Sequence, residues 1–252
     1  MSSKTAITAC LVIIGNEILS GRTEDANLSF LGHHLNELGI RLAEARVIAD
    51  DEAVIIETVN KCRRRFDYVF TTGGIGPTHD DITSAAIAKA FGVKLERNAE
   101  ARALLDQQYR HKDINDARLK MADIPTGATL IENPVSKAPG YQIENVFVMA
   151  GVPRIMQAMF DGSKHRLKGG EAVLSEAVTA SITEGVMAEK LAAVQARHQQ
   201  VEIGSYPFFR DGKMGVSLVM RHTDAERVEK AAADIKAMLR DLGALPPKDL
   251  DD

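Results

Sequence analysis

The sequence predicts an α/β protein built on a doubly wound, mostly parallel sheet, with a second, smaller α+β domain. Through most of the chain, apolar runs of strand length alternate with amphipathic helical patterns. The last third follows a strand-helix-strand-strand-helix order, which is typical of a small α+β layer with its helices packed on one face. In the first part, several strands give way directly to polar or glycine-rich loops. These loops are the predicted ligand-binding region.

The first element is a continuous apolar run at residues 6–14, AITACLVII. Such a run is typical of a strand buried on both faces of a parallel sheet. A polar turn and a leucine-lined helix follow, and the helix is expected to end at Gly39. The next strand is predicted over 40–48, and Asp50 or Asp51 is expected to cap the helix after it.

Beyond residue 93 the pattern is less regular. The predicted elements there are helices at 100–112 and 115–122, short strands around a loop at 133–140, a strand at 145–149 and a helix from 154 to 160. A charged segment with several glycines at 161–170 marks a domain boundary, so we expect domains at 1–165 and 166–252. The second domain is predicted to contain a strand at 175–183, a helix at 186–199, strands at 201–208 and 214–221, and a helix at 224–242, with a disordered tail from Pro246 to Asp252.

The overall composition narrows the possible partners. The 252 residues carry a net charge of -4, with a pI near 6.0 and no basic patch of the kind that binds nucleic acid. The two cysteines do not form a disulfide framework or a CxxC metal motif. No charged leader precedes a long apolar stretch, and no segment approaches a membrane-spanning length. We therefore expect a cytoplasmic protein with no nucleic-acid or membrane partner.

The stretch FTTGGIGPTHDDIT, residues 70–83, is the strongest functional signal. An apolar strand enters a loop with Gly73, Gly74 and Gly76, and a helical pattern begins directly after Asp80 and Asp81. Glycines let backbone N–H groups approach a ligand, and a helix N-terminus favours an anion such as phosphate. Acidic residues in such a loop would repel the anion unless a divalent cation lies between them. The pattern predicts a phosphate or pyrophosphate ligand bridged by Mg²⁺ or another divalent cation.

Other loops are expected to reach the same edge of the sheet, because the carboxyl ends of parallel strands lie together. They bring candidate polar residues from three further places in the chain: Glu17, Asp25 and Asn27; Asp50; and Ser136 with Lys137. Simpler explanations exist for several of them. Asp50 would often be only a helix N-cap, Glu17 an ordinary turn residue, and one of Asp80 and Asp81 the cap of the following helix.

Five motifs together resemble the MoaB/Mog molybdopterin-binding fold family: GNEILSGRTEDAN (15–27), VIADDEAVI (47–55), TTGGIGPTHDDIT (71–83), NPVSKAPGY (133–141) and MAGVP (149–153). Within it, the chain is most similar to the N-terminal domain of the CinA proteins and to that of eukaryotic FAD synthase. The resemblance implies that Asp81 and Asp50 are the metal-linked and catalytic carboxylates. From their positions in the sequence, Glu17 is a further catalytic candidate and Asp80 a further metal ligand beside Asp81. The resemblance also implies a phosphate held by Gly73, Gly74, Gly76 and the backbone around Pro77 and Thr78. The convergence of the strand-end loops adds further candidate ligand contacts at Asn27, Ser136, Lys137, Gly140, Gly151 and Pro153. Relatives of this fold commonly self-associate, so a homo-oligomer is expected.

Three functions remain open from the sequence. The first is a metal-dependent pyrophosphatase that cleaves ADP-ribose, FAD or a related dinucleotide, as the CinA-like branch implies. The second is a protein of molybdenum cofactor biosynthesis that binds or adenylylates molybdopterin. The third is a non-catalytic nucleotide-binding or assembly module. The branch usually has an aspartate where this chain has Asn16, which would remove one charge from a metal site there.

Overall fold

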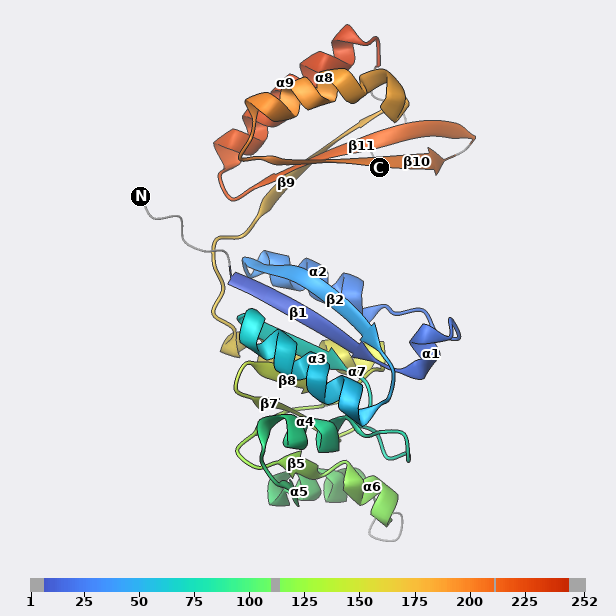
Figure 1. Ribbon diagram of the computed structural model, residues 1–252, viewed down its shortest axis with the longest axis vertical. Coiled ribbons are helices and arrows are strands. Elements are labelled where there is room, and N and C mark those ends of the chain that lie inside the picture. The colour runs from blue at the N-terminus through green and yellow to red at the C-terminus, as the bar shows by residue number, and fades with distance from the viewer. Residues whose placement is uncertain (1–6, 110–113, 211, 245–252) are drawn as a thin grey trace. The chain divides into compact units, whose positions relative to one another are not determined.

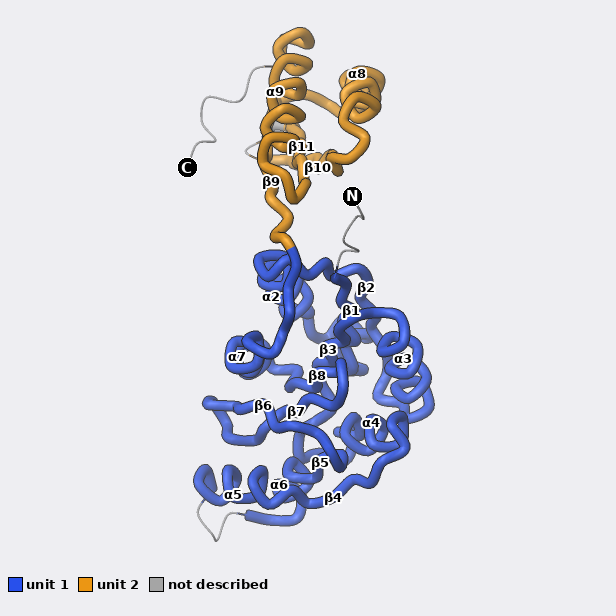
Figure 2. Tube along the Cα trace, turned by 90° about the vertical axis from the view of Figure 1, so that its left-hand side faces the viewer, with its two compact units in different colours: residues 1–170 blue, residues 171–252 orange. Residues whose placement is uncertain are grey.

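The computed structural model describes residues 7–109, 114–210 and 212–244 of the 252-residue chain. The chain divides into two compact units, residues 1–170 and residues 171–252 (Figure 2). The first unit contains all the predicted site residues. The predicted disordered tail, from Pro246 onward, lies outside the described residues.

Unit 1 is built around a six-stranded sheet in the order β2-β1-β3-β8-β7-β6 (Figure 1). Its strands are β2 (Ile40–Ile48), β1 (Ile7–Ile14), β3 (Tyr68–Thr72), β8 (Val146–Met149), β7 (Gly140–Ile143) and β6 (Thr129–Ile131). The first four in this order are parallel, whereas β7 pairs antiparallel with both β8 and β6. The expectation of a mostly parallel, doubly wound sheet is confirmed.

Helices cover both faces of this sheet. The helices on one face are α3 (Glu52–Arg65), α4 (Thr83–Phe91) and α5 (Ala99–Gln108), and those on the other are α2 (Asn27–Glu37) and α7 (Pro153–Ser163). Alternate residues of β1 enter the two cores, with Val12 on the α3 side and Leu11 on the α2 side, both fully buried. This burial explains why β1 is apolar from Ala9 to Ile14, since neither face of the strand meets water there.

Several short elements differ from the prediction. The expected polar turn at 16–27 contains a short helix, α1 (Asn16–Leu19), and a separate antiparallel pair is formed by β4 (Leu95–Arg97) and β5 (Asp123–Pro125). Three-residue strands are too short to show a periodicity. The helix predicted over 115–122 is only α6 (Asp116–Lys120) because β5 follows it closely. The end of the helix predicted over 100–112 lies partly outside the described residues.

The segment predicted as an interdomain linker remains attached to unit 1. Helix α7 continues into a 3₁₀ helix, η1 (Lys164–Arg166). The Arg166 Nη2 donates to the Leu130 carbonyl at 2.8 Å, and the Lys168 N–H donates to the Tyr68 hydroxyl at 2.8 Å. These bonds explain why the first unit extends to Gly170, a few residues beyond the predicted boundary.

Unit 2 is a small α+β domain. Its antiparallel sheet has the order β10-β11-β9, and its elements are β9 (Leu174–Ala180), α8 (Glu184–Arg197), β10 (Glu202–Arg210), β11 (Lys213–His222) and α9 (Ala225–Asp241). Both helices pack on the same face of the sheet, as predicted (Figure 1). Alternate β11 residues Val216, Leu218 and Met220 are fully buried beneath them.

Candidate functional site

Backbone hydrogen bonds connect the carboxyl ends of neighbouring parallel strands. The Gly15 N–H, after β1, donates to the Ile48 carbonyl of β2 at 3.1 Å, and the Gly73 N–H, after β3, donates to the Met149 carbonyl of β8 at 3.1 Å. The loops after four strands therefore start side by side at one edge of the sheet. This is the edge at which open α/β sheets bind ligands.

The glycine loop lies against the end of β1. Gly73 has φ 103° and Gly74 has φ 69°, conformations that residues with a side chain rarely adopt. A Cβ atom on Gly73 would stand 2.1 Å from the Ile14 carbonyl oxygen, and one on Gly74 would stand 2.1 Å from Thr83 Oγ1. Thr83 holds the loop from the other side, since its hydroxyl donates to the Gly73 carbonyl at 3.0 Å and its N–H to the Gly74 carbonyl at 2.9 Å. Both glycines are thus required by the close approach of the backbone.

The two neighbouring aspartates after β2 have different structural roles. Asp51 caps α3, because its Oδ1 accepts a hydrogen bond from the Val54 N–H at 3.0 Å. Asp50 instead points to the β1 end, where its Oδ2 accepts a hydrogen bond from the Asn16 N–H at 2.8 Å. The alternative in which Asp50 is merely a helix cap is therefore excluded. Its carboxylate is held at the edge where the strand-end loops meet.

Asp81 organises the tip of the glycine loop. Its Oδ2 accepts from the Thr78 N–H at 2.8 Å and from the Thr78 hydroxyl at 2.5 Å, and it lies beside Gly76. Neither Asp80 nor Asp81 caps α4, whose N-cap position is Ile82, so the alternative in which one of them is only a helix cap is excluded. The pKa of exposed Asp80 lies below its usual range, chiefly through Thr78 and also through its own backbone N–H. Both carboxylates thus belong to the glycine loop and not to the helix cap.

The loop with Ser136 and Lys137 reaches the same sheet edge. Ile131 of β6 pairs with Gly140 of β7, and antiparallel β7 starts level with the carboxyl end of β8. Asn133, which is 3% exposed, holds the loop: its Nδ2 donates to Ser136 Oγ at 2.6 Å and to the Ala138 carbonyl at 2.9 Å, while its Oδ1 accepts from the Ser136 N–H at 3.1 Å. Lys137 has a φ of 59°, an uncommon conformation for a lysine. The Asn133 hydrogen bonds therefore hold this loop in one conformation.

The remaining predicted residues are placed as follows. Asn27 is 2% exposed and donates through Nδ2 to the Gly151 carbonyl at 2.8 Å, which ties the start of α2 to the end of β8. The Glu17 carboxylate lies over Gly15. Gly140 has a structural role, because a Cβ there would be 2.4 Å from the Val148 carbonyl oxygen. Pro153 occupies the first turn of α7, where proline is favoured.

Buried polar atoms also gather near this edge. Asn27 Oδ1 and the hydroxyls of Thr71 and Thr72, at the end of β3, are buried and have no hydrogen-bond partner. Such atoms cost free energy unless something satisfies them. Thr72, Thr83 and Asn133 also lie at the candidate site, and sequence reasoning did not single them out. For Asn133 the Asn-Pro dipeptide was an available signal, since it favours turn initiation.

The carboxylates of the glycine loop are too few to hold Mg²⁺ alone, but they could hold it together with the phosphates of a bound ligand. Among the residues that the structure describes, no group of three or more His, Cys, Asp or Glu side chains is placed to hold a metal ion. Mg²⁺, however, commonly binds through one or two carboxylates plus substrate phosphates. Asp80 and Asp81 offer such oxygen donors, and the two Thr78 hydrogen bonds occupy only Oδ2 of Asp81. The residues therefore fit a cation that arrives with a phosphate ligand.

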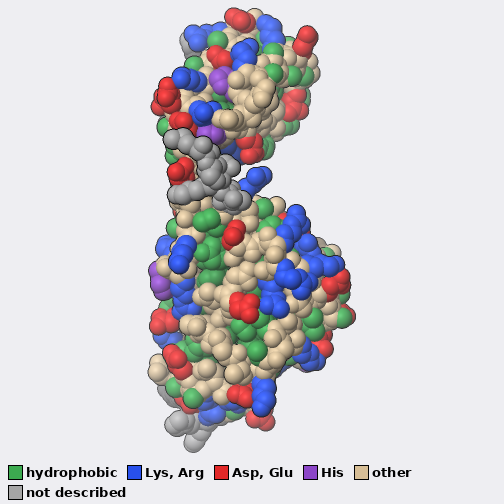
Figure 3. Space-filling view, turned by 60° about the vertical axis from the view of Figure 1, so that its left-hand side comes forward, with side chains coloured by type: hydrophobic (Ala, Val, Ile, Leu, Met, Phe, Trp, Pro, Cys, Tyr) green, Lys and Arg blue, Asp and Glu red, His purple; other side chains and the backbone are tan. Residues whose placement is uncertain are grey.

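The basic residues on the surface of unit 1 do not form a second anion-binding site. Lys and Arg side chains gather over part of unit 1 (Figure 3), but the basic end of α3 is paired with glutamates: Lys61 with Glu57, Arg63 with Glu144 and Arg65 with Glu44. No helix in the described parts of the chain is long and apolar enough to cross a membrane.

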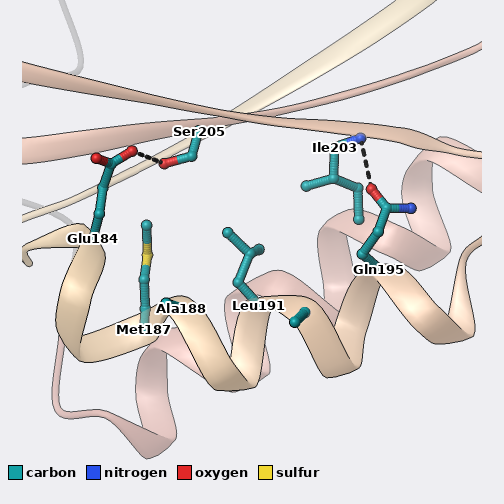
Figure 4. Close-up of a pocket in the computed structure, with 8 residues that line it drawn as sticks. Glu184, Met187, Ala188, Leu191, Gln195, Ile203 and Ser205 are labelled. Carbon is teal, nitrogen blue, oxygen red and sulfur yellow. Dashed lines mark hydrogen bonds between the residues drawn. The ribbon is translucent and has the colours of Figure 1, made fainter.

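A hollow in unit 2 lies between α8 and β10 and has a volume of about 320 Å³ (Figure 4). Its polar groups already bond to one another: Ser205 donates to Glu184 at 2.6 Å, and the Ile203 N–H donates to Gln195 Oε1 at 3.2 Å. Met187 and Leu191 make much of the remaining wall apolar. The predicted site residues all lie elsewhere, in unit 1.

The doubly wound sheet and its glycine-rich strand-end loops define unit 1 as an open α/β domain with its candidate site at the carboxyl ends of the strands. A family model described as "Probable molybdopterin binding domain" matches residues 10–168, and the chain belongs to this family. A second model, described as "FAD synthase, middle domain", matches residues 172–247. The two matches correspond to the two units.

Named relatives support the same placement. The crystal structure of CinA from Thermoplasma acidophilum is 35% identical with a TM-score of 0.61, and the match covers 64% of this chain and 98% of that one. A CinA-like protein of Syntrophus aciditrophicus is 35% identical over an alignment of 232 positions, which covers 86% of this chain and 54% of that protein. A probable FAD synthase of Caenorhabditis elegans is 29% identical over an alignment of 258 positions, which covers 92% of this chain and 50% of the relative. This chain thus spans about half the length of the last two proteins.

Proposed function

We propose that the protein is a metal-dependent hydrolase that cleaves the pyrophosphate link of a dinucleotide such as ADP-ribose or FAD. The observation that carries this proposal is the meeting of a backbone anion cradle with a fixed carboxylate at one sheet edge. The cradle is the Gly73–Gly74 turn with the start of α4, and the carboxylate is that of Asp50. A substrate with two linked phosphates would place one phosphate in the backbone cradle and the other near the Asp50 carboxylate.

The cradle would bind one phosphate through backbone N–H groups. Ile82 cannot cap α4 with its side chain, and the Thr83 N–H is used by Gly74. The N–H groups of Ser84 and Ala85 have no acceptor within the helix, since the first turn of any helix lacks one. These donors and the positive end of the helix dipole favour an anion.

The carboxylates would serve the second phosphate and the attacking water. Asp81 and Asp80 would hold Mg²⁺ or a similar cation, which when bound supplies positive charge beside the phosphates. The Asn16 N–H fixes one oxygen of Asp50, so that this carboxylate is oriented to accept a proton from water as general base. Glu17 on α1 is the second candidate for that role.

The test is hydrolysis of ADP-ribose, FAD and NAD by the purified protein with Mg²⁺, Mn²⁺ or Co²⁺, and with chelator. Asp50→Asn is expected to lower turnover by about 10² to 10⁴-fold, the usual contribution of a general base. Asp51→Asn is the matched control, because it changes a neighbouring aspartate to another good N-cap residue. Asp81→Asn should abolish metal-dependent turnover.

Molybdopterin binding or adenylylation is the second candidate, and the family match over residues 10–168 favours it. Adenylylation requires ATP and molybdopterin together, so product analysis separates the two reactions. Failure to hydrolyse any dinucleotide, with a pterin or nucleotide still bound, would overturn the hydrolase proposal. If Asp81→Asn leaves phosphate affinity intact and the wild-type chain shows no turnover, the protein is a non-catalytic binding module.

A further inference from the structure

The two cysteines of the chain meet inside unit 1. Cys10 lies on β1 and Cys62 on α3, and both are fully buried. Their sulfur atoms are 3.5 Å apart, and the Cys10 thiol donates a hydrogen bond to Cys62 Sγ. The pair is 52 residues apart in sequence, so the contact is made by the fold and not by local geometry.

The surroundings favour thiolate character at one of the two sulfurs. The hydrogen bond from Cys10 lowers the pKa of Cys62, and the nearby Arg46 guanidinium acts in the same direction. The same hydrogen bond, together with burial, raises the pKa of the Cys10 thiol. Arg46 is held in turn by Glu44, with Nε 2.6 Å from the carboxylate oxygen. Burial of Cys62 and the nearby Glu44 oppose the lowering of its pKa, so the reaction of this close pair of thiols depends on access of the oxidant.

We propose that Cys10 and Cys62 form a reversible dithiol–disulfide modification site that a two-electron oxidant such as hydrogen peroxide converts. The Cys62 thiolate attacks one peroxide oxygen, which gives a sulfenic acid and releases hydroxide. The Cys10 sulfur then attacks the Cys62 sulfur, the S–S bond forms, and the sulfenic oxygen leaves as water with the Cys10 proton. Two electrons pass from the sulfurs to the peroxide, and a dithiol reductant reverses the change.

The geometry requires little movement. A disulfide bond is about 2.05 Å long, so the sulfurs must approach by about 1.5 Å, which is within the reach of small side-chain rotations. Bond formation would close a covalent loop from residue 10 to residue 62. That loop contains Glu17, Asn27 and Asp50 of the candidate site. Oxidation would therefore join the middle of β1 to the C-terminal turn of α3, away from the sheet edge where these residues lie.

Burial determines how the reaction is controlled. With both sulfurs at 0% exposure, an oxidant can reach them only during local opening of α3 from the sheet. The site should therefore oxidise slowly in the native protein and faster in urea well below the unfolding midpoint. This dependence distinguishes a buried pair from surface cysteines, whose oxidation low urea would leave almost unchanged.

The experiment uses the full-length chain, reduced and then incubated with hydrogen peroxide. The product is denatured, its free thiols are alkylated, and its mass is measured. We expect loss of two hydrogen atoms, no alkylation, a Cys10–Cys62 cross-linked peptide after digestion, and full reversal by dithiothreitol. Cys10→Ala and Cys62→Ala should each leave one thiol and no intramolecular bond. Two alkylated cysteines, sulfinic acids or only intermolecular dimers in the wild-type protein would overturn the proposal.

A second measurement does not depend on the variants folding. The oxidised wild-type chain should keep its native circular dichroism spectrum, and its urea midpoint for unit 1 should rise, because a cross-link reduces the entropy of the unfolded chain. A native spectrum is the result that supports the geometry. If the bond forms only after global unfolding, and the oxidised protein loses the native spectrum, then the two sulfurs are not positioned for it.

Discussion

Substitution of Gly73 by alanine tests the physical basis of the candidate ligand loop. Gly73 has φ 103°, and a residue with a side chain pays about 1–3 kcal/mol to hold such a conformation. The added methyl would also stand 2.1 Å from the Ile14 carbonyl oxygen, so the backbone of the loop or of β1 must move. Forced overpacking of this kind costs about 1–3 kcal/mol more. We expect a total destabilisation of about 2–6 kcal/mol.

Gly21→Ala is the matched control. Gly21 also has a positive φ, 70°, but no atom lies within 4 Å of its added Cβ. Its cost should be the conformational one alone, about 1–2 kcal/mol. For a domain of this size each kcal/mol lowers the melting temperature by about 2–4 °C. Gly73→Ala should therefore melt roughly 10 °C lower than the wild type, and Gly21→Ala about 3 °C lower.

The chain contains no tryptophan, so unfolding is best followed by far-UV circular dichroism. Gly73→Ala should in addition weaken phosphate or nucleotide binding in calorimetry, since the cradle would be displaced. Equal thermal shifts for the two variants would refute the reasoning, because they would show that the approach of Gly73 to Ile14 imposes no steric limit. A large shift with unaltered ligand binding would separate the fold role of Gly73 from any ligand role.

Three further substitutions have definite expected outcomes. Thr83→Val removes the hydroxyl bonded to the Gly73 carbonyl at nearly constant volume and should cost about 1–3 kcal/mol in urea unfolding, whereas no loss would show that this bond is replaced. Asn133→Ala removes the hydrogen bonds of the 133–138 loop and should expose it to limited proteolysis, with an unchanged cleavage pattern as the contrary result. In unit 2, the hydrogen bond from His198 holds the pKa of Asp234 below its usual range. A lowered carboxyl pKa stabilises the fold above the usual range, and this stability is lost as the pH falls through the lowered value. Acid unfolding of Asp234→Asn should therefore lack that contribution, and identical acid midpoints would contradict it.

The fold could be predicted largely because its central strands are buried on both faces. The uninterrupted apolar run of β1 is a strong signal, and the glycines after β3 mark the loop that approaches Ile14. β4 and β5 gave no such signal, since each is three residues long and β4 is exposed throughout. The site residues on the strand ends were accessible to the same reasoning. Thr83, by contrast, is seen as an anchor of the loop only when its two bonds to the glycine carbonyls are visible.

Asp50 and Asp51 show why composition alone could not separate structural from functional roles. Either residue is a good N-cap at the end of β2. Only the backbone path decides that Asp51 meets the Val54 N–H while Asp50 meets the Asn16 N–H of a different loop. The second contact joins segments 34 residues apart, and no local pattern contains it. Helix capping thus leaves one aspartate free to act in the candidate site.

Strands β6 and β7 form an antiparallel hairpin, and the loop between them lies at the carboxyl edge of the sheet. In a purely parallel sheet, the chain would instead cross over to the opposite edge before the next strand. After a parallel strand the chain leaves the carboxyl edge and returns by a crossover. Because β7 runs against β8, its first residue, Gly140, lies level with Met149, and the preceding loop is brought to the carboxyl edge as well. Asn133 then holds that loop in one shape beside the strand ends. Reversal of the single strand β7 therefore places Ser136 and Lys137 at the same edge as the glycine loop, which makes them candidates for setting ligand specificity.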